Sequence, residues 1–103
     1  MSITIGRFTF EGPYASTGPL RHQQGIYSIL CQPFFGSPTV VDVGESEDVS
    51  ARVENHDRQS CWKRNCNAKL SVAVLYTPGY TADQRRAIER GLRQQYNPSC
   101  GAR

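Results

Sequence analysis

The chain has 103 residues, a net charge of +3 and 38% hydrophobic residues, values typical of one small globular domain spanning residues 1–103. Its longest nearly apolar run, residues 70–76, is far shorter than the roughly 18 residues that a membrane-spanning helix requires, so no membrane association is expected. The first residues lack the charged start and apolar centre of a signal peptide. We therefore expect a cytoplasmic globular protein.

The two halves of the chain carry opposite net charge. Residues 1–57 contain three arginines and seven acidic residues, which gives −4, whereas residues 58–103 contain nine basic and two acidic residues, which gives +7. A basic C-terminal half is typical of proteins that bind nucleic acid. An arginine-rich helix face that is merely solvated would produce the same pattern.

The four cysteines lie at positions 31, 61, 66 and 100, and without export we expect reduced thiols. His56, Cys61, Cys66 and Cys100 could in principle supply the four ligands of a tetrahedral zinc site. Four residues separate Cys61 from Cys66, however, whereas zinc pairs are commonly separated by two. Free, partly buried thiols are the favoured interpretation, and structural zinc is not expected.

The N-terminal half reads mainly as strands. Alternating β-branched and aromatic residues predict a strand over residues 3–10, which we expect at an edge of the sheet. Residues 25–31 and 39–43 are rich in β-forming residues, and a short segment with two prolines and a glycine connects them. These two strands are expected to pair as an antiparallel hairpin.

The hairpin is followed by a helical pattern. Ser46 is a good N-cap, and acidic residues fall in the first turn, where the helix dipole favours them. Val49, Val53 and His56 then recur on one helical face. The spacing predicts a helix over residues 47–56.

The C-terminal half contains a strand and a second helix. Residues 57–68 are polar and irregular, and residues 69–77 predict the third strand of the sheet. A capping box at Thr81 and apolar residues at every fourth position predict a helix over residues 82–96. The expected fold class is therefore α/β (α+β): a small, mainly antiparallel three-stranded sheet flanked by helices, with an added N-terminal strand.

Two polar residues border the apolar faces of these helices. A carboxylate in the position of Glu89 can coordinate a hard cation such as Mg²⁺, and a guanidinium in the position of Arg52 can hold a phosphate oxygen. The alternative for Glu89 is a surface ion pair, because Arg85 and Arg93 both lie one helical turn away.

Five segments resemble, in order and in type, the motifs of the GIY-YIG nuclease family. In chain order they are Gly25-Ile26-Tyr27, Asp42-Val43-Gly44 followed by Ser46, Arg52 with His56 four residues later, Glu89, and the Leu92, Tyr96 and Pro98 that follow it. The match covers about residues 25–101. It implies a GIY-YIG-like core on the predicted strands and helices.

The resemblance also implies a chemistry, the divalent-metal-dependent hydrolysis of DNA phosphodiesters by an endonuclease. Glu89 would bind one Mg²⁺ or Mn²⁺ ion, Tyr27 would help to take the proton from the attacking water, and Arg52 would stabilise the charged transition state. His56 would contact phosphate, base or Tyr27, or would simply complete the apolar face of its helix.

Some positions depart from the family pattern. Asp42 stands where the family has its second tyrosine, Glu45 where a basic or polar residue is usual, and Gly101 near the place of a terminal asparagine. Asp42 could act as a base or as a second metal ligand, or it could mark a decayed active site.

Two non-catalytic functions therefore remain open beside the nuclease. One is a nucleic-acid-binding module that uses the basic side chains of the last helix, which are Arg85, Arg86, Arg90 and Arg93. The other is a protein-interaction domain that kept the fold. We expect a single domain without an attached target-reading module, so a protein partner could supply target specificity.

Overall fold

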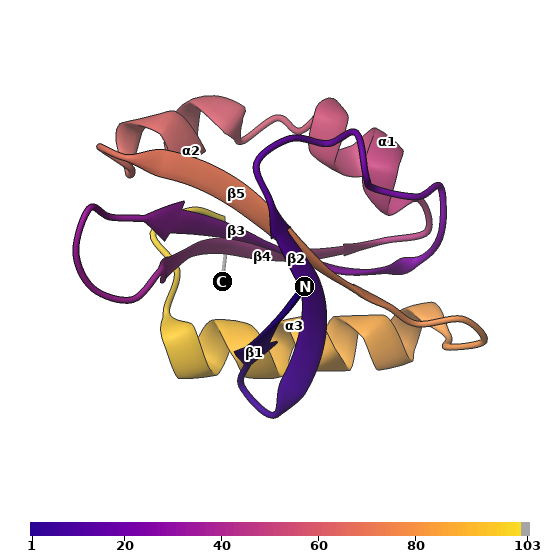
Figure 1. Ribbon diagram of the computed structural model, residues 1–103. Helices are drawn as coiled ribbons and strands as arrows, with labels where there is room; N and C mark the ends of the chain where they lie inside the picture. The colour runs from indigo at the N-terminus through magenta and orange to yellow at the C-terminus, as the bar shows by residue number, and fades with distance from the viewer. Residues whose placement is uncertain (102–103) are drawn as a thin grey trace.

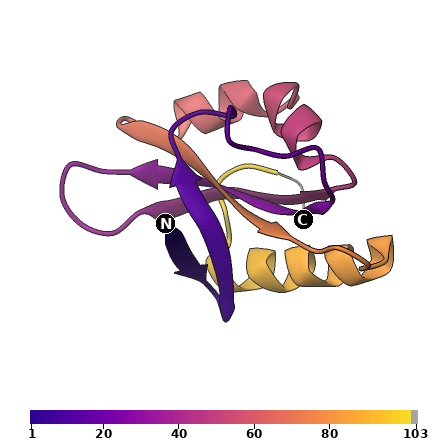
Figure 2. The ribbon, with the colours of Figure 1, turned by 45° about the vertical axis from the view of Figure 1, so that its right-hand side comes forward.

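The computed structural model describes residues 1–101 and shows an α+β architecture of three layers (Figure 1). Its elements are β1 (Ser2–Ile5), β2 (Phe8–Tyr14), β3 (Gly25–Gln32), β4 (Thr39–Ser46), α1 (Val49–Glu54), α2 (Gln59–Arg64), β5 (Lys69–Tyr76) and α3 (Ala82–Tyr96). Within the described residues the five strands form one antiparallel sheet, in the order β1-β2-β5-β3-β4. Helices α1 and α2 cover one face and α3 covers the other (Figure 2). The predicted fold class is confirmed.

The predicted hairpin and third strand form the centre of this sheet. β3 pairs with β4 on one side and with β5 on the other, so that Tyr27 lies between Gly44 and Val74. Seven of the eight residues of β3 are buried, because the strand has neighbours on both sides and helices on both faces. The tyrosine of the first motif therefore lies in the most enclosed strand of the fold.

The N-terminal segment differs from its prediction, since it forms two strands rather than one. Gly6 adopts a positive φ of 62°, which allows the chain to reverse between β1 and β2. β2 then pairs with β5, and β1 becomes the outer edge. The alternating pattern of residues 3–10 hid this turn, because the sequence on both sides of Gly6 favours strands equally.

The first helical region also differs in detail. α1 is shorter than predicted and is capped by Asp48, whose carboxylate accepts a hydrogen bond from the backbone N–H of Ala51 at 3.0 Å. The stretch 57–68, expected to be irregular, contains α2. The single buried side chain of α2 is Trp62, which explains why no helical periodicity was visible in the sequence.

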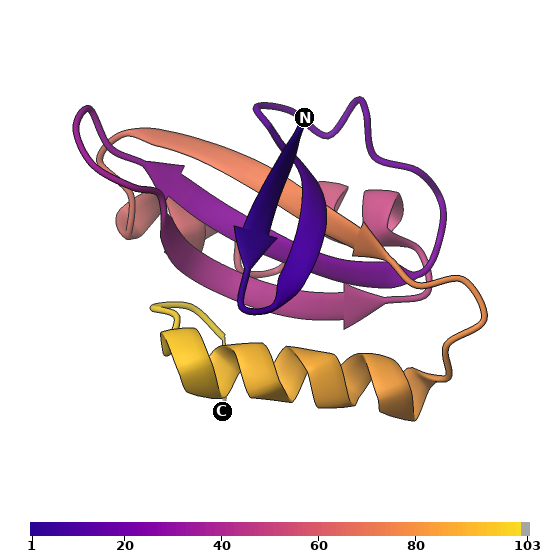
Figure 3. The same ribbon diagram turned by 60° about the horizontal axis from the view of Figure 1, so that its bottom comes forward.

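α3 runs along the sheet with its apolar stripe inward (Figure 3). The capping box between Thr81 and Gln84 forms as predicted, and the helix ends at Asn97 in the left-handed conformation. Leu92 is buried against the sheet and Ile88 packs beside it. In residues 1–101 no helix is both long and apolar enough to cross a membrane.

The prediction of reduced thiols is wrong, because the four cysteines form two disulfides. Cys31 in β3 bonds Cys66 in the loop after α2, and Cys61 in α2 bonds Cys100 in the segment after α3. The partners are 35 and 39 residues apart in the sequence, so only the folded topology reveals the pairing. The first bond holds the loop after α2 against β3, and the second ties α2 to the segment after α3. These sulfurs are not available as zinc ligands.

Candidate active site

Tyr27 and His56 form a buried pair at the end of β3 nearest α1. The hydroxyl of Tyr27 lies 2.6 Å from Nε2 of His56. Nδ1 of His56 accepts a hydrogen bond from the backbone N–H of Arg58 at 3.0 Å, so the proton of the neutral imidazole lies on Nε2. His56 therefore donates to the Tyr27 oxygen, and the hydroxyl proton of Tyr27 remains available to another acceptor.

Both members of this pair are neutral at pH 7. Burial raises the pKa of Tyr27 to about 12, although the charge of Arg52 lowers it. Burial and the positive charges of Arg52 and Arg58 lower the pKa of His56 to about 4. The two residues are only 1% and 5% exposed. They can therefore relay a hydrogen bond, but neither is a charged group in the resting protein.

The glycine of the second motif has a packing role. Gly44 lies opposite Tyr27 in the β3–β4 ladder, and a Cβ at position 44 would come 2.1 Å from the Tyr27 hydroxyl oxygen. Any larger residue would displace the phenol ring. The first two sequence motifs are thus linked by direct contact between a tyrosine and the glycine beneath it.

Arg52 lies close enough to act electrostatically on both Tyr27 and His56. Its side chain is 38% exposed, and its guanidinium contacts Oδ1 of Asp57 at 3.1 Å. Asp57 is largely exposed, and exposed ion pairs of this kind are weak. The structure thus brings three predicted site residues together, and one of them faces solvent.

Asp42 is fully buried in β4, where its carboxylate is surrounded by donors. The donors are Arg58 Nε at 2.8 Å, Trp62 Nε1 at 2.7 Å, Arg93 Nη2 at 2.5 Å and the backbone N–H of Val43 at 2.8 Å. We call these four side chains, Asp42, Arg58, Trp62 and Arg93, the Asp42 cluster. The carboxylate is near Tyr27, but its oxygens are already occupied by partners inside the protein.

The sequence pattern indicated no role for Arg58 or Trp62, which complete this cluster. A buried carboxylate in a strand that is covered on both faces needs hydrogen-bond donors inside the protein. Asp42 within a run of β-forming residues was therefore the feature of the sequence that indicated such donors. Trp62 lies in α2 and Arg58 is the residue before it, and because the sequence did not predict this helix, the two donors could not be assigned in advance.

Glu89 lies on α3 one turn before Arg93. Oε2 of Glu89 is 3.4 Å from Arg93 Nε, and the Glu89 side chain is 25% exposed. Arg93 also donates to the backbone oxygens of Val43 and Cys100. It therefore connects Glu89 to Asp42 across the edge of the sheet.

Glu89 fits a hydrated divalent ion better than a closed protein cage. Across residues 1–101 no group of three or more His, Cys, Asp or Glu side chains is placed to hold a metal. Mg²⁺ commonly keeps several waters and takes only one or two carboxylates together with substrate oxygens. A part-exposed carboxylate with one long contact meets that requirement.

The predicted basic face of α3 divides into two parts. Arg85 and Arg93 are buried and bind Glu45 and Asp42, with Arg85 Nε 2.9 Å from Glu45 Oε1. Both side chains are thus committed to partners within the chain. Arg86 and Arg90 are exposed on the outer side of the helix.

Comparison with known proteins identifies the fold. No family model and no curated protein matches the sequence. Solved structures do match, and the architecture that they share with this chain is the GIY-YIG fold, as the sequence motifs predicted.

Two of these structures are of the GIY-YIG N-terminal endonuclease domain of UvrC from Thermotoga maritima. Each is a point mutant that replaces a tyrosine by phenylalanine, with the catalytic divalent cation bound. Their TM-scores are 0.59 and 0.58, at 12% and 11% sequence identity, and each alignment covers 84% of this chain and 91% of the other. At this identity the similarity establishes the fold.

Proposed function

We propose that this chain is a divalent-metal-dependent nuclease domain that hydrolyses phosphodiester bonds in DNA. One observation carries the proposal, the convergence of Tyr27, Arg52 and His56 at one end of β3, with 2.6 Å between the tyrosine hydroxyl and the imidazole. These side chains come from separate elements and are the types that phosphoryl transfer needs, a hydroxyl, a cation and a proton carrier. The similar UvrC domain binds a catalytic divalent cation, which supports the metal dependence.

In this mechanism Arg52 exchanges its weak contact with Asp57 for a phosphate oxygen and stabilises the negative charge of the transition state. Tyr27 accepts the Nε2 proton of His56 in a hydrogen bond and directs its own proton toward the phosphate. With a pKa of about 12, Tyr27 takes a proton from the attacking water only as it passes its own proton to a phosphate oxygen. Glu89 would hold Mg²⁺ or Mn²⁺, which neutralises charge on the phosphate and on the leaving oxygen.

The test is cleavage of plasmid and oligonucleotide DNA with Mg²⁺ or Mn²⁺, compared with chelator. Glu89→Gln removes the charge and keeps the shape, so we expect cleavage to fall by at least about 100-fold while binding to DNA persists. Glu47→Gln is the matched control, because Glu47 is exposed and its loss changes the net charge equally. Undiminished cleavage by highly purified Glu89→Gln protein would contradict the metal assignment.

A second candidate is a non-catalytic module for nucleic-acid or protein binding that kept the fold. It is favoured by the Asp42 cluster, in which the residue at the second tyrosine position has its oxygens occupied, and by the 1% exposure of Tyr27. Absence of metal-dependent cleavage by the wild type, combined with DNA binding that weakens steeply with salt, would select the DNA-binding form of this function.

The disulfides bear on where the protein acts. Two such bonds in a small chain are typical of oxidising environments. We therefore do not retain the cytoplasmic location expected from the sequence. DNA is the proposed partner, and a protein partner remains one source of target specificity.

A further inference from the structure

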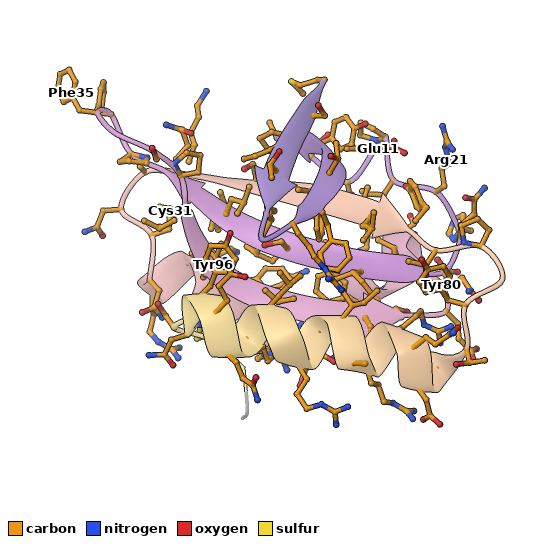
Figure 4. The ribbon with its side chains drawn as sticks, turned by 90° about the horizontal axis from the view of Figure 1, so that it is seen from below. Glu11, Arg21, Cys31, Phe35, Tyr80 and Tyr96 are labelled. Carbon is orange, nitrogen blue, oxygen red and sulfur yellow. A yellow bond between two sulfur atoms is a disulfide. The ribbon has the colours of Figure 1, made fainter. Side chains whose placement is uncertain are left out.

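The tip of the β3–β4 hairpin exposes two adjacent aromatic side chains. Phe34 is 97% and Phe35 91% exposed, and the loop that carries them extends beyond the sheet (Figure 4). Their ring centroids are 6.4 Å apart and the planes are inclined by 40°, so the rings do not cover each other. Contiguous exposed apolar surface of this kind is a candidate contact surface.

The tip is built on a rigid base. The disulfide from Cys31, at the end of β3, to Cys66 ties the hairpin to the loop after α2. Gln32 pairs with Lys69 of β5 directly beside it. A hollow of about 390 Å³ lies next to Phe34 and is lined also by Gln32, Pro33, Ala68 and Lys69. The two rings are thus presented from a base held by a disulfide and by strand pairing, with a recess of mixed apolar and polar lining at their side.

The segments joined to the base of the hairpin, α2 with the loop that follows it and β5, carry basic residues. Lys63, Arg64 and Lys69 are exposed, and no ion pair to any of them occurs among residues 1–101. The sequence contains no acidic residue over positions 58–82 and none over positions 25–41. Cations beside exposed aromatic rings are the combination by which proteins bind single-stranded nucleic acid, since the rings stack on bases and the cations contact phosphates.

We propose that the hairpin tip recognises unpaired bases in DNA, by stacking Phe34 and Phe35 on them while Lys63, Arg64 and Lys69 hold the flanking phosphates. This inference rests on the proposed function, in that DNA is the substrate, and it names the class: duplex interrupted by a bulge, gap or junction. A lipid surface fits less well, because stable insertion needs a larger apolar face than two side chains provide.

The hairpin also fixes where such DNA would be cut. Seven residues separate Tyr27 from Phe34, and because β3 ends at Gln32 and Phe34 lies in a bend of the loop, the span is at most roughly 23 Å at about 3.3 Å per residue. Duplex DNA rises about 3.4 Å per base pair, so this limit corresponds to about seven base pairs. Cleavage is expected at a constant offset of no more than about seven base pairs from the unpaired bases.

The test measures binding in chelator, where no cleavage occurs. The probe is a duplex with a three-nucleotide bulge that contains the fluorescent base 2-aminopurine, compared with the same duplex fully paired. We expect the wild type to bind the bulged DNA at least about tenfold more tightly and to change the 2-aminopurine fluorescence by stacking. The double variant Phe34→Ala/Phe35→Ala should lose both effects and keep its affinity for paired duplex.

Tyr80→Ala is the matched control, because Tyr80 is an exposed aromatic residue at the opposite end of the molecule (Figure 4). It should retain the preference for bulged DNA. Equal affinity of the wild type for the two DNAs, or a preference that survives in the double variant, would overturn the inference. So would binding of the wild type to phosphatidylglycerol vesicles that the double variant loses, if neither protein distinguishes the DNAs.

The two proposals can fail separately. A preference for bulged DNA without metal-dependent cleavage would support recognition of unpaired bases by the hairpin tip and contradict the proposed nuclease activity. Cleavage at positions unrelated to the bulge, together with unchanged affinity in the double variant, would support the nuclease activity and contradict recognition of unpaired bases by the tip. Phe34→Leu/Phe35→Leu keeps the apolar character and removes the aromatic faces, so it should lose the preference if stacking is the cause.

Discussion

Asp42 and Glu89 are two carboxylates that contact the same guanidinium, that of Arg93, from two different parts of the molecule. Asp42 lies inside the edge of the sheet, is 0% exposed, and accepts hydrogen bonds from β4, α2, α3 and the residue before α2. Glu89 lies on α3 with a quarter of its side chain exposed and a single contact of 3.4 Å. The first is saturated by the protein, whereas the second has capacity left for a ligand.

The two carboxylates at this edge of the sheet therefore have different roles, one in stability and one available for chemistry. A buried carboxylate with two guanidinium partners holds its elements together, because removing it would leave positive charges without compensation. A part-exposed carboxylate contributes little to stability and can exchange its partner for a metal or water. We therefore expect substitutions at the two positions to affect different properties.

The largest expected effect is that of Asp42→Ala. It leaves the buried Arg93 and the half-buried Arg58 without their anion and should lower the free energy of unfolding by about 3–5 kcal/mol. Urea denaturation followed by the fluorescence of Trp62 measures this directly. Asp42→Tyr should also destabilise rather than restore a family-like site, because the phenol cannot replace the carboxylate. A loss below about 1 kcal/mol for Asp42→Ala would mean that the cluster is not a stabilising centre.

The second effect concerns the disulfides that enclose this edge. Cys61–Cys100 holds the segment after α3 beside β4, where the backbone N–H of Cys100 donates to Val41 at 2.9 Å. Replacing both cysteines by serine should cost about 2–4 kcal/mol. Thiol titration of the denatured, unreduced protein should detect no free thiols, and four reactive thiols would contradict the pairing.

The third effect is a pH dependence that originates at His56. The folded protein holds the pKa of His56 near 4, mainly by burial and then by the charges of Arg52 and Arg58, whereas the unfolded value is near 6.5. Between these values the unfolded chain binds a proton that the folded protein does not. The free energy of unfolding therefore falls as the pH is lowered from about 6.5 to about 4, by on the order of 2–3 kcal/mol.

The measurement is urea denaturation at several pH values for the wild type and for His56→Gln. The difference between the two curves isolates His56 from the carboxylates, which titrate in both proteins. His22→Gln is the control, since His22 is exposed, and it should retain the wild-type dependence on His56. Parallel curves for the wild type and His56→Gln would contradict the buried neutral imidazole.

The smallest expected effect on stability is that of Glu89→Gln. It removes one contact between residues one helical turn apart, for which about 0.5 kcal/mol or less is typical. Urea denaturation should place this variant within that range of the wild type. A loss as large as that of Asp42→Ala would show that Glu89 is also a structural group.

The sequence predicted the central hairpin, the third strand and the last helix, because each has a strong local pattern. Thr81 and Gln84 specify a capping box within four residues, and the first motif lies in a run of β-forming residues. These are features that neighbouring residues determine. Contact of His56 with Tyr27 was one of several alternatives that the family motifs left open, and the structure shows that contact between residues far apart in the chain.

What the sequence did not reveal depends on contacts between distant residues. The two disulfides, the donors around Asp42 and the reversal at Gly6 have no short-range signature, since their partners lie far apart in the chain or their local pattern favours strand. The arginines of α3 illustrate this limit. Helical spacing placed them on the helix, but only the packed structure separates the buried Arg85 and Arg93 from the exposed Arg86 and Arg90.

The most direct test measures two properties of two matched variants. Asp42→Asn and Glu89→Gln each replace a carboxylate next to Arg93 by an amide, and each is assayed for the free energy of unfolding and for Mg²⁺-dependent cleavage of DNA. We expect Glu89→Gln to keep its stability and lose cleavage, and Asp42→Asn to lose stability by more than about 2 kcal/mol. Loss of cleavage in Asp42→Asn at unchanged stability, together with full activity in Glu89→Gln, would contradict the assignment of these two carboxylates.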